Sequence, residues 1–197
     1  MRSYCRKMEK RLIIFIDSGD TLVDESTEIR KIPGGVVYEA EFVDGALETL
    51  RQLKEKGYRI ALVADGLQES FERVYGKDFL KNDFEALAIS EIVGEEKPSA
   101  KMFMTAMKKM GLQETDKNRI LMVGNNLKRD ILGANHFGIQ SALMKWSPRY
   151  SMVPEMKDET PDYYVDNPLE LLILAETLEE ELRKQESRDD KEDNSCF

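Results

Sequence analysis

Cysteine is scarce and long apolar runs are missing, and each absence restricts what this chain can be. The 197 residues include only two cysteines, Cys5 and Cys196, one near each end and neither in a metal-like spacing, which excludes a disulfide framework and a thiolate zinc site. The longest apolar run, 12–16, has five residues, whereas a membrane span needs about 20 and an export signal about 7–15. We therefore expect no membrane crossing, no export signal and a cytoplasmic protein.

Glycine and proline are also few, and positive charge is in deficit. The 12 glycines and 6 prolines fall far below the roughly 25–30% of a low-complexity chain, so we expect the chain to fold. Its formal net charge is −9, which argues against nucleic acid as a partner because such binding relies on a basic surface. Residues 1–11 are basic, and we interpret them as a frayed terminus rather than a small phosphate-binding arm.

The length fits one domain with a single core. We expect a basic N-terminal extension over 1–11, the main domain over 12–175, and a charged helix end with a tail over 176–197. The last seven residues, KEDNSCF, contain too little apolar surface to pack. Their composition therefore predicts disorder.

Short apolar runs alternate with segments of helical period, which is typical of an α/β fold with a parallel sheet covered by helices. We expect strands at 12–16, 59–64, 86–93, 119–123, 140–144 and 163–165, helices at 44–56, 67–75, 99–110, 127–137 and from Pro168 onward, and a small hairpin around 33–42. The chain contains neither GxGxxG nor GxxxxGK(S/T), so a dinucleotide fingerprint and a P-loop are not predicted.

Polar residues follow three of the predicted strands. They are DSGDT at 17–21, ADG at 64–66, and GNN at 124–126 with Asp130 shortly beyond. Because the carboxyl ends of parallel strands meet at one edge of a sheet, we expect these residues to lie close together. Lys97 precedes a predicted helix and would join them. Such a group of carboxylates requires a cation, because like charges at short range are costly unless paired or metal-bound.

This pattern resembles the haloacid dehalogenase-like (HAD) superfamily, mostly phosphatases, over residues 12–165. IFIDSGDTL is similar to the first motif of the family, an apolar strand followed by DxDGT, and ALVADG is similar to the second. Lys97 matches the third motif, and VGNNLKRD resembles the fourth, normally GDxxxxD. The resemblance implies a Rossmann-like parallel sheet that forms a HAD-like catalytic domain.

The resemblance also implies a Mg²⁺-dependent phosphatase that works through an aspartyl-phosphate. Asp17 would be the nucleophile, Lys97 would hold it and offset negative charge, and Thr21 would steady the loop by hydrogen bonding. The residues implied to bind Mg²⁺ are Asp17, the carbonyl of Gly19, Asn125 and Asp130. Those implied to bind a phosphorylated substrate are Ala64, Asp65, Gly66 and Lys97.

The chain departs from the family pattern in the first, second and fourth motifs. Gly19 stands where the family has its acid/base aspartate, with Asp20 in the place of the usual glycine. Asp20 cannot be assumed to protonate the leaving group, and loss of such an acid is typically worth about 10² to 10⁴ in rate. Ala64 replaces a hydroxyl residue that donates to the phosphoryl group, and Asn125 replaces an aspartate near the metal.

The gaps between the motifs leave no room for a cap domain, so a capless site open to large substrates is expected. An oligomer-supplied lid stays an open alternative. The main rival hypothesis is a weakened or inactive HAD-like domain that binds a phosphorylated ligand or a protein partner, and a third is a phosphoacceptor domain resembling response regulators. Trp146, in KWSPRY, is expected to pack rather than to bind substrate.

Overall fold

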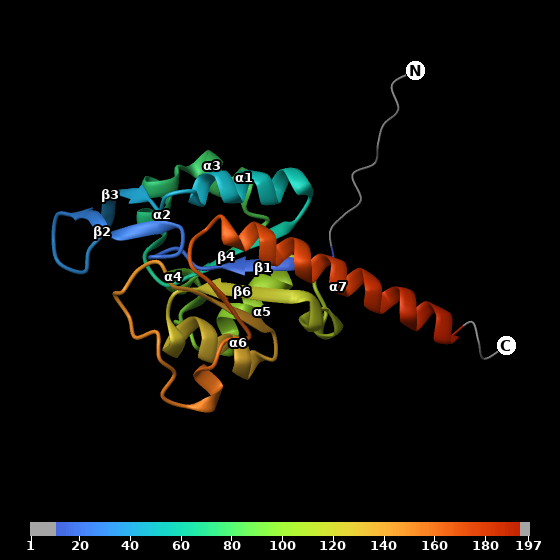
Figure 1. Cartoon of the computed structure of the whole chain (residues 1–197). Helices are drawn as coiled ribbons and strands as arrows, with labels where there is room; N and C mark the ends of the chain where they lie inside the picture. The colour runs from blue at the N-terminus through green and yellow to red at the C-terminus, as the bar shows by residue number, and fades with distance from the viewer. Residues whose placement is uncertain (1–10, 194–197) are drawn as a thin grey trace, which may run out of the picture.

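A computed structural model describes residues 11–193, and a six-stranded parallel sheet forms the centre of the molecule (Figure 1). The strands are β1 (Ile13–Ile16), β4 (Arg59–Ala64), β5 (Ala86–Ile89), β6 (Ile120–Gly124), β7 (Gln140–Met144) and β8 (Tyr163–Val165), in the spatial order β5-β4-β1-β6-β7-β8. β1 therefore lies between β4 and β6. The predicted α/β fold with a parallel sheet flanked by helices is confirmed.

Helices cover both faces of the sheet (Figure 1). The apolar side chains of α1 (Ala46–Lys56), α2 (Gln68–Tyr75), α3 (Lys77–Asp83) and α7 (Glu170–Asp193) pack with Ile14 and Ile16 of β1. Those of α4 (Ser90–Val93), α5 (Ala100–Lys109) and α6 (Leu132–Phe137) pack with Ile13 and Phe15. The alternation of side chains along β1 thus supplies both cores, because successive residues of a strand point to opposite faces.

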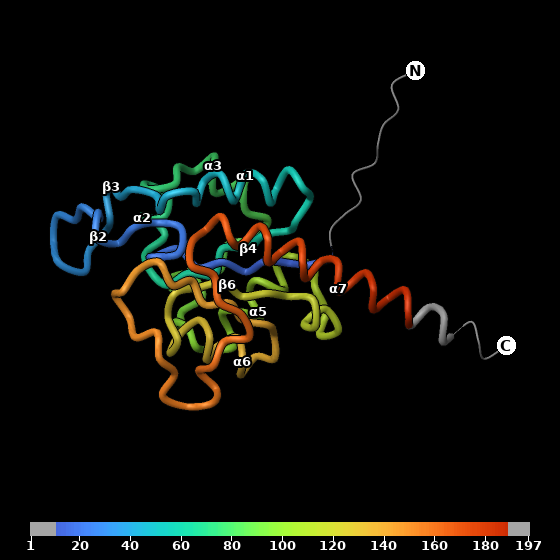
Figure 2. Tube along the Cα trace, in the orientation of Figure 1, coloured from blue at the N-terminus to red at the C-terminus, as the bar shows by residue number. Residues whose placement is uncertain are grey.

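An antiparallel hairpin of β2 (Val23–Arg30) and β3 (Val37–Phe42) projects from the sheet (Figures 1 and 2). The sequence predicted a hairpin only around 33–42, which is the turn and the second strand. The first strand, VDESTEIR, was missed because its charged residues do not show the alternation of a half-buried strand. Within residues 11–193 the hairpin and α1 fill the segment between β1 and β4, so the prediction that no cap domain is present is confirmed.

Three other elements differ from the sequence prediction. The predicted strand at 86–93 ends at Ile89, and 90–93 form the short helix α4. Helix α3 was not predicted, since only one of its residues, Leu80, is buried and the chain shows no apolar period there. The predicted helix at 127–137 begins with a π-helical turn, Leu127–Ile131, before it continues as α6.

The two ends of the chain are described only in part. Residues 1–10 of the predicted basic extension and 194–197 of the predicted tail lie outside the described residues. Helix α7 continues to Asp193, three residues into the segment predicted to be disordered. Two of these three residues, Lys191 and Glu192, have a high helix propensity, which a prediction based on apolar content does not consider. Among residues 11–193, no helix has both the length and the apolarity that a membrane span requires.

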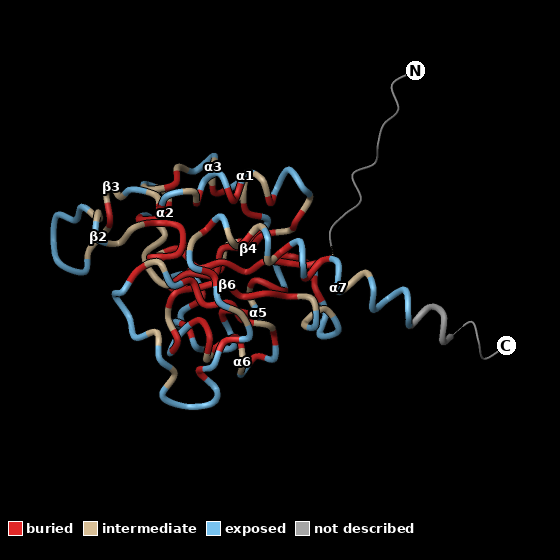
Figure 3. The backbone as a smooth tube through the Cα atoms, viewed as in Figure 1, coloured by how far each residue is buried: buried red, intermediate tan, exposed pale blue. Residues whose placement is uncertain are grey.

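Burial follows this architecture, with the strands buried at the centre and the hairpin tip and residues 184–188 of α7 exposed (Figure 3). α7 is fastened to the start of β1 by one buried carboxylate. Glu179 Oε2 accepts hydrogen bonds from the backbone N–H groups of Arg11 at 2.9 Å and Leu12 at 3.0 Å. This contact lies at the edge of the sheet opposite Asp17, because Asp17 follows the carboxyl end of β1.

We predict that Glu179→Ala lowers the free energy of unfolding by about 3 kcal/mol, because it leaves two backbone donors without their acceptor. Glu180→Ala is the matched control, since Glu180 is exposed and pairs only loosely with Lys184 at 3.6 Å; its effect should stay within about 0.5 kcal/mol. Urea denaturation of the two variants measures the difference. Equal effects of the two substitutions would contradict the anchoring role of Glu179.

Candidate active site

The carboxyl ends of β1, β4 and β6 bring three loops together beside Asp17. The backbone N–H of Asp17 donates to the carbonyl of Val123 at 2.9 Å, which continues the ladder between β1 and β6 by one residue. The segment after β4 lies on the other side of β1. Because the chain leaves β1 between these two neighbours, Asp17 is placed where ligands of open α/β sheets bind.

Lys97 joins the carboxylates of two of these loops. Its Nζ lies 2.5 Å from Asp17 Oδ1 and 2.6 Å from Asp130 Oδ1, and it donates to the carbonyl of Val63 at 2.9 Å. The side chain of Lys97 is only 2% exposed. The structure thus brings together three of the predicted site residues, Asp17, Lys97 and Asp130, from points far apart in the chain.

The charges of this cluster depend on one another. Burial favours the neutral amine of Lys97, but the carboxylates of Asp130 and Asp17 outweigh burial and raise its pKa. Burial raises the pKa of Asp17 to about 7, an effect that Lys97 opposes and the negative charge of Asp130 increases. A second positive charge beside Asp17 and Asp130 would therefore favour the ionised form of Asp17.

The metal-ligand candidates Asp130 and Asn125 lie on the loop that leaves β6. Asp130 sits in the π-helical turn, where its Oδ2 accepts from the N–H of Asn126 at 3.0 Å. Gly124 leaves room for this carboxylate, because a Cβ at position 124 would lie 2.6 Å from the Cβ of Asp130 and overlap its carboxyl group. Asn125 is buried, and its Nδ2 has no hydrogen-bond partner in the described chain.

This donor set fits Mg²⁺. Asp17, Asp130 and Asn125 offer hard oxygen donors, and Lys97 contacts one oxygen of each carboxylate, Asp17 Oδ1 and Asp130 Oδ1. Among the side chains that the structure describes, residues 11–188, no three of His, Cys, Asp or Glu cluster closely enough to hold a metal ion. Two carboxylates with an amide, a backbone carbonyl and water agree with the preference of Mg²⁺, which usually takes one or two carboxylates and keeps several waters.

Of the substrate-binding residues predicted after β4, Ala64 lies in the core, whereas Asp65 and Gly66 lie at the surface of the cleft. Ala64 is completely buried in the hydrophobic core with residues of α1 and α2 and does not line the cleft. Asp65 Oδ1 accepts from the backbone N–H of Lys97 at 3.0 Å, and its Oδ2 lies 3.4 Å from Arg129 Nη1. The N–H of Gly66 donates to Ser90 Oγ at 2.9 Å. Asp65 and Gly66 line the cleft beside Asp17.

The loop after Asp17 is stabilised by its backbone. Thr21 is fully buried, and its Oγ1 forms no hydrogen bond with the described residues, so the predicted steadying role of this hydroxyl is wrong. The carbonyl of Ser18 instead accepts from the N–H groups of Thr21, Leu22 and Val23 at 3.2, 2.8 and 2.9 Å. Three donors on one carbonyl hold the turn that leads from Asp17 into the hairpin.

Asp20 is fully buried and has a φ of +46°, in the left-handed region where the family usually has glycine. Its Oδ1 accepts from the N–H of Glu25 at 3.0 Å, and its Oδ2 accepts from Ser147 Oγ at 3.0 Å and from Arg149 Nε. Trp146 packs on the core, as predicted, and donates from Nε1 to the carbonyl of Asp20 at 2.6 Å. The carboxylate of Asp20 thus holds the surrounding loops together.

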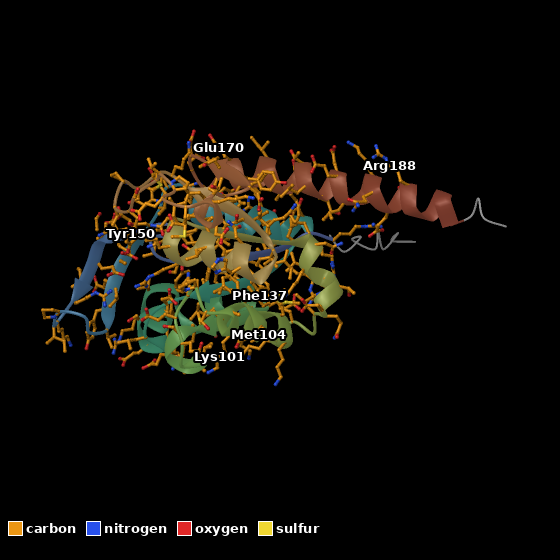
Figure 4. The ribbon with its side chains drawn as sticks, turned by 90° about the horizontal axis from the view of Figure 1, so that it is seen from below. Lys101, Met104, Phe137, Tyr150, Glu170 and Arg188 are labelled. Carbon is orange, nitrogen blue, oxygen red and sulfur yellow. The ribbon has the colours of Figure 1, made fainter. Side chains whose placement is uncertain are left out.

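Glu25, Arg149 and Tyr150 also lie at the site and were not predicted from the sequence. Glu25 and Tyr150 line the small cavity that contains Asp17, Lys97 and Asp130, and Figure 4 shows Tyr150 on the side of the molecule from which the hairpin projects. Burial and the negative charges of Asp20 and Glu28 raise the pKa of Glu25, and Arg149 opposes the rise. Arg149 and Tyr150 follow β7, so they would have been found by extending the search for polar residues at strand ends to this strand.

The cavity around Asp17 adjoins a larger cleft under the hairpin. The inner cavity has a volume of about 50 Å³ and the cleft about 550 Å³, and both are lined by Gly19, Glu25 and Asp65. The cleft is further bounded by β2, β3, α2 and the segment around α4. The inner cavity has room for a small group beside Asp17 and Lys97, and the cleft has room for the rest of a ligand.

Carboxylates at strand ends fit both a HAD-like domain and a phosphoacceptor domain resembling response regulators. Comparison with known families distinguishes the two. The family model described as haloacid dehalogenase-like hydrolase matches residues 17–144. This chain belongs to the haloacid dehalogenase-like hydrolase family. The resemblance seen in the four motifs is thereby confirmed, and the HAD-like match contains Asp17, Lys97 and Asp130.

Individual relatives agree with this membership. A glyceraldehyde 3-phosphate phosphatase from Methanopyrus kandleri is 32% identical over 133 residues, which cover 67% of this chain and 55% of the relative. The chain thus spans about half the length of the curated relatives it matches. A HAD phosphatase from Thermococcus onnurineus is similar in structure, with a TM-score of 0.66 and 15% identity over 83% of this chain and 97% of that one. The magnesium-bound putative HAD-hydrolase YfnB from Bacillus subtilis has a TM-score of 0.58 and 21% identity over 68% and 56%.

We predict that Gly124→Ala weakens Mg²⁺ binding by about 10- to 100-fold, because the added methyl group displaces the carboxylate of Asp130. Isothermal titration calorimetry with MgCl₂ measures this change. The comparison variant is Asp130→Asn, alone and combined with Gly124→Ala. Since both substitutions act on one carboxylate, the double variant should bind Mg²⁺ no more weakly than Asp130→Asn alone. Additive losses would show that Gly124 acts elsewhere.

Proposed function

We propose that this protein is a Mg²⁺-dependent phosphohydrolase that works through an aspartyl-phosphate on Asp17. The observation that carries the proposal is the position of Lys97 Nζ between Asp17 and Asp130, at 2.5 and 2.6 Å, in a cavity at the carboxyl edge of the sheet. Phosphatases among the relatives support the same reaction class.

In the first step an oxygen of Asp17 attacks phosphorus, and the bond between phosphorus and the leaving oxygen breaks. In the second step water attacks the phosphorus of the aspartyl-phosphate and releases inorganic phosphate and Asp17. Lys97 offsets the negative charge that gathers on the phosphoryl oxygens and keeps the carboxylate of Asp17 in position. Fixed positive charge of this kind supplies much of the catalysis in phosphoryl transfer.

The proposed Mg²⁺ ligands are Asp17, the backbone carbonyl of Gly19, Asn125 and Asp130. When bound, the ion would supply positive charge to the phosphoryl oxygens. Asp130 is held for this role by the N–H of Asn126 and by the space that Gly124 leaves. Asn125 contributes an uncharged oxygen, so this site carries one negative charge fewer than a site with aspartate at that position.

The proposed substrate is a phosphorylated compound whose remaining part lies in the cleft under the hairpin. Asp65 and Gly66 line that cleft together with apolar side chains of α2, Phe71 and Val74. The net charge of −9 makes nucleic acid an unsuitable substrate. A cytoplasmic location and a lid supplied by an oligomer stay predictions from the sequence.

A second function is favoured by two positions of the site. Gly19 provides no carboxyl group of its own, and Ala64 provides no hydroxyl and is buried away from the cleft. A domain that has lost these groups would bind a phosphorylated ligand or a protein partner without turning it over. The two functions differ in whether phosphate is released.

We predict Mg²⁺-dependent hydrolysis of p-nitrophenyl phosphate by the wild-type protein and a loss of about 10³-fold or more in Asp17→Asn, because the amide is a poor nucleophile. Release of p-nitrophenolate with and without MgCl₂ measures both. This ester is the first choice because its leaving group needs little protonation, so the glycine at position 19 does not hide activity.

Two outcomes would contradict this assignment. Turnover that persists in Asp17→Asn would exclude Asp17 as the nucleophile. A folded wild-type protein that binds Mg²⁺ without turnover would favour the binding function. Because the family takes its name from dehalogenation, 2-chloropropionate serves as a control, and we expect no chloride release from it.

A further inference from the structure

A carboxyl group occupies the space that a side chain at position 19 would take. The three atoms nearest to a Cβ built on Gly19 all belong to Glu25, with Cδ at 2.8 Å and Oε1 overlapping it. Position 19 is where the pattern of the first motif places an aspartate. Glu25 of β2 therefore brings a carboxyl group to this place from six residues farther along the chain.

The hairpin and the loop after Asp17 hold Glu25 there. Its backbone N–H donates to Asp20 Oδ1 at 3.0 Å, and its Oε2 lies 3.3 Å from Arg149 Nε. Arg149 also donates to Asp20. Asp20 thus binds both the backbone of Glu25 and the cation that contacts its side chain.

The position of Glu25 explains both departures from the first motif, the glycine at position 19 and the aspartate at position 20. A glycine at position 19 leaves the space that the Glu25 side chain fills. An aspartate at position 20 tolerates the left-handed backbone and supplies the acceptor for Glu25 and Arg149. The exchange of Asp and Gly therefore fits the transfer of the carboxyl function from position 19 to position 25.

Glu25 also lies at the junction where a leaving group would sit. It lines the inner cavity with Asp17, Lys97 and Asp130, and it lines the larger cleft with Ser18 and Phe71. Its side chain is 30% exposed. A phosphoryl group beside Asp17 would thus have its ester oxygen on the side of the cleft that Glu25 faces.

We propose that Glu25 is the general acid and base of the reaction, which rests on the function proposed above. As the bond from phosphorus to the leaving oxygen breaks, the proton of the Glu25 carboxyl group passes to that oxygen, so that the alcohol leaves neutral and Glu25 becomes a carboxylate. In the second step Glu25 takes a proton from the attacking water. The bond between phosphorus and Asp17 then breaks, and phosphate, Asp17 and protonated Glu25 result.

The test compares two aryl phosphates that differ in one nitro group. We expect Glu25→Gln to lower kcat/KM for phenyl phosphate by about 100-fold, because its leaving group requires a proton. For p-nitrophenyl phosphate we expect kcat/KM to change by less than about threefold, since kcat/KM reports the first transfer and this leaving group departs without help. Glu39→Gln, on the exposed part of β3, is the matched control and should leave the ratio unchanged.

A second pair of variants separates proton transfer from a structural role of Glu25. Glu25→Ala removes the carboxyl group and the overlap with position 19, so Gly19→Asp in that background can place an aspartate there. We expect the double variant to recover at least tenfold in kcat/KM for phenyl phosphate over Glu25→Ala. The proposal would be overturned if the double variant did not recover kcat/KM for phenyl phosphate. It would also be overturned if Glu25→Gln lowered kcat/KM equally for both esters, or for neither. A wild-type protein inactive toward both esters would instead overturn the phosphatase function itself.

Discussion

The buried ammonium group of Lys97 is the interaction on which the site depends. Two carboxylates, Asp17 and Asp130, are brought within reach of each other at the carboxyl edge of the sheet, and both are buried with Lys97 between them. Buried like charges without a cation are unstable, whereas a cation between them offsets the cost of removing them from water. The same positive charge is available to a phosphoryl group, so the contact that stabilises the site also prepares it for an anionic substrate.

The fold supplies this contact through strand order. β1 lies between β4 and β6, so the residues that follow these three strands meet although they are distant in sequence. Asp65 then holds the backbone of Lys97, and Gly124 leaves the space for Asp130. The hairpin of β2 and β3 borders the cleft in place of a separate domain, and it contributes Glu25 to the catalytic cavity.

Local patterns were sufficient to predict most of the sheet and the central residues of the site. Buried strands such as β1 and β6 are apolar throughout, and the polar residues that follow them identified Asp17 and Asp130, whereas Lys97 was identified by its place before a predicted helix and its match to the third motif. The sequence could not show that Glu25 fills the space beside Gly19, because this depends on how a charged strand turns back over the loop. The sequence also could not show that the side chains of Ala64 and Thr21 are fully buried. Burial of a particular side chain depends on how helices from elsewhere in the chain pack against it.

The central claim is that Asp17 carries the phosphoryl group during turnover. The most direct measurement is mass spectrometry of peptides from protein quenched in acid shortly after mixing with p-nitrophenyl phosphate and MgCl₂. The account predicts one added phosphoryl group on the peptide that contains Asp17, and none on that peptide in Asp17→Asn. Rapid turnover with the phosphoryl group on a different residue would contradict it. So would an unmodified Asp17 peptide in Glu25→Gln, where attack by water on the aspartyl-phosphate is expected to be slow and the intermediate should accumulate.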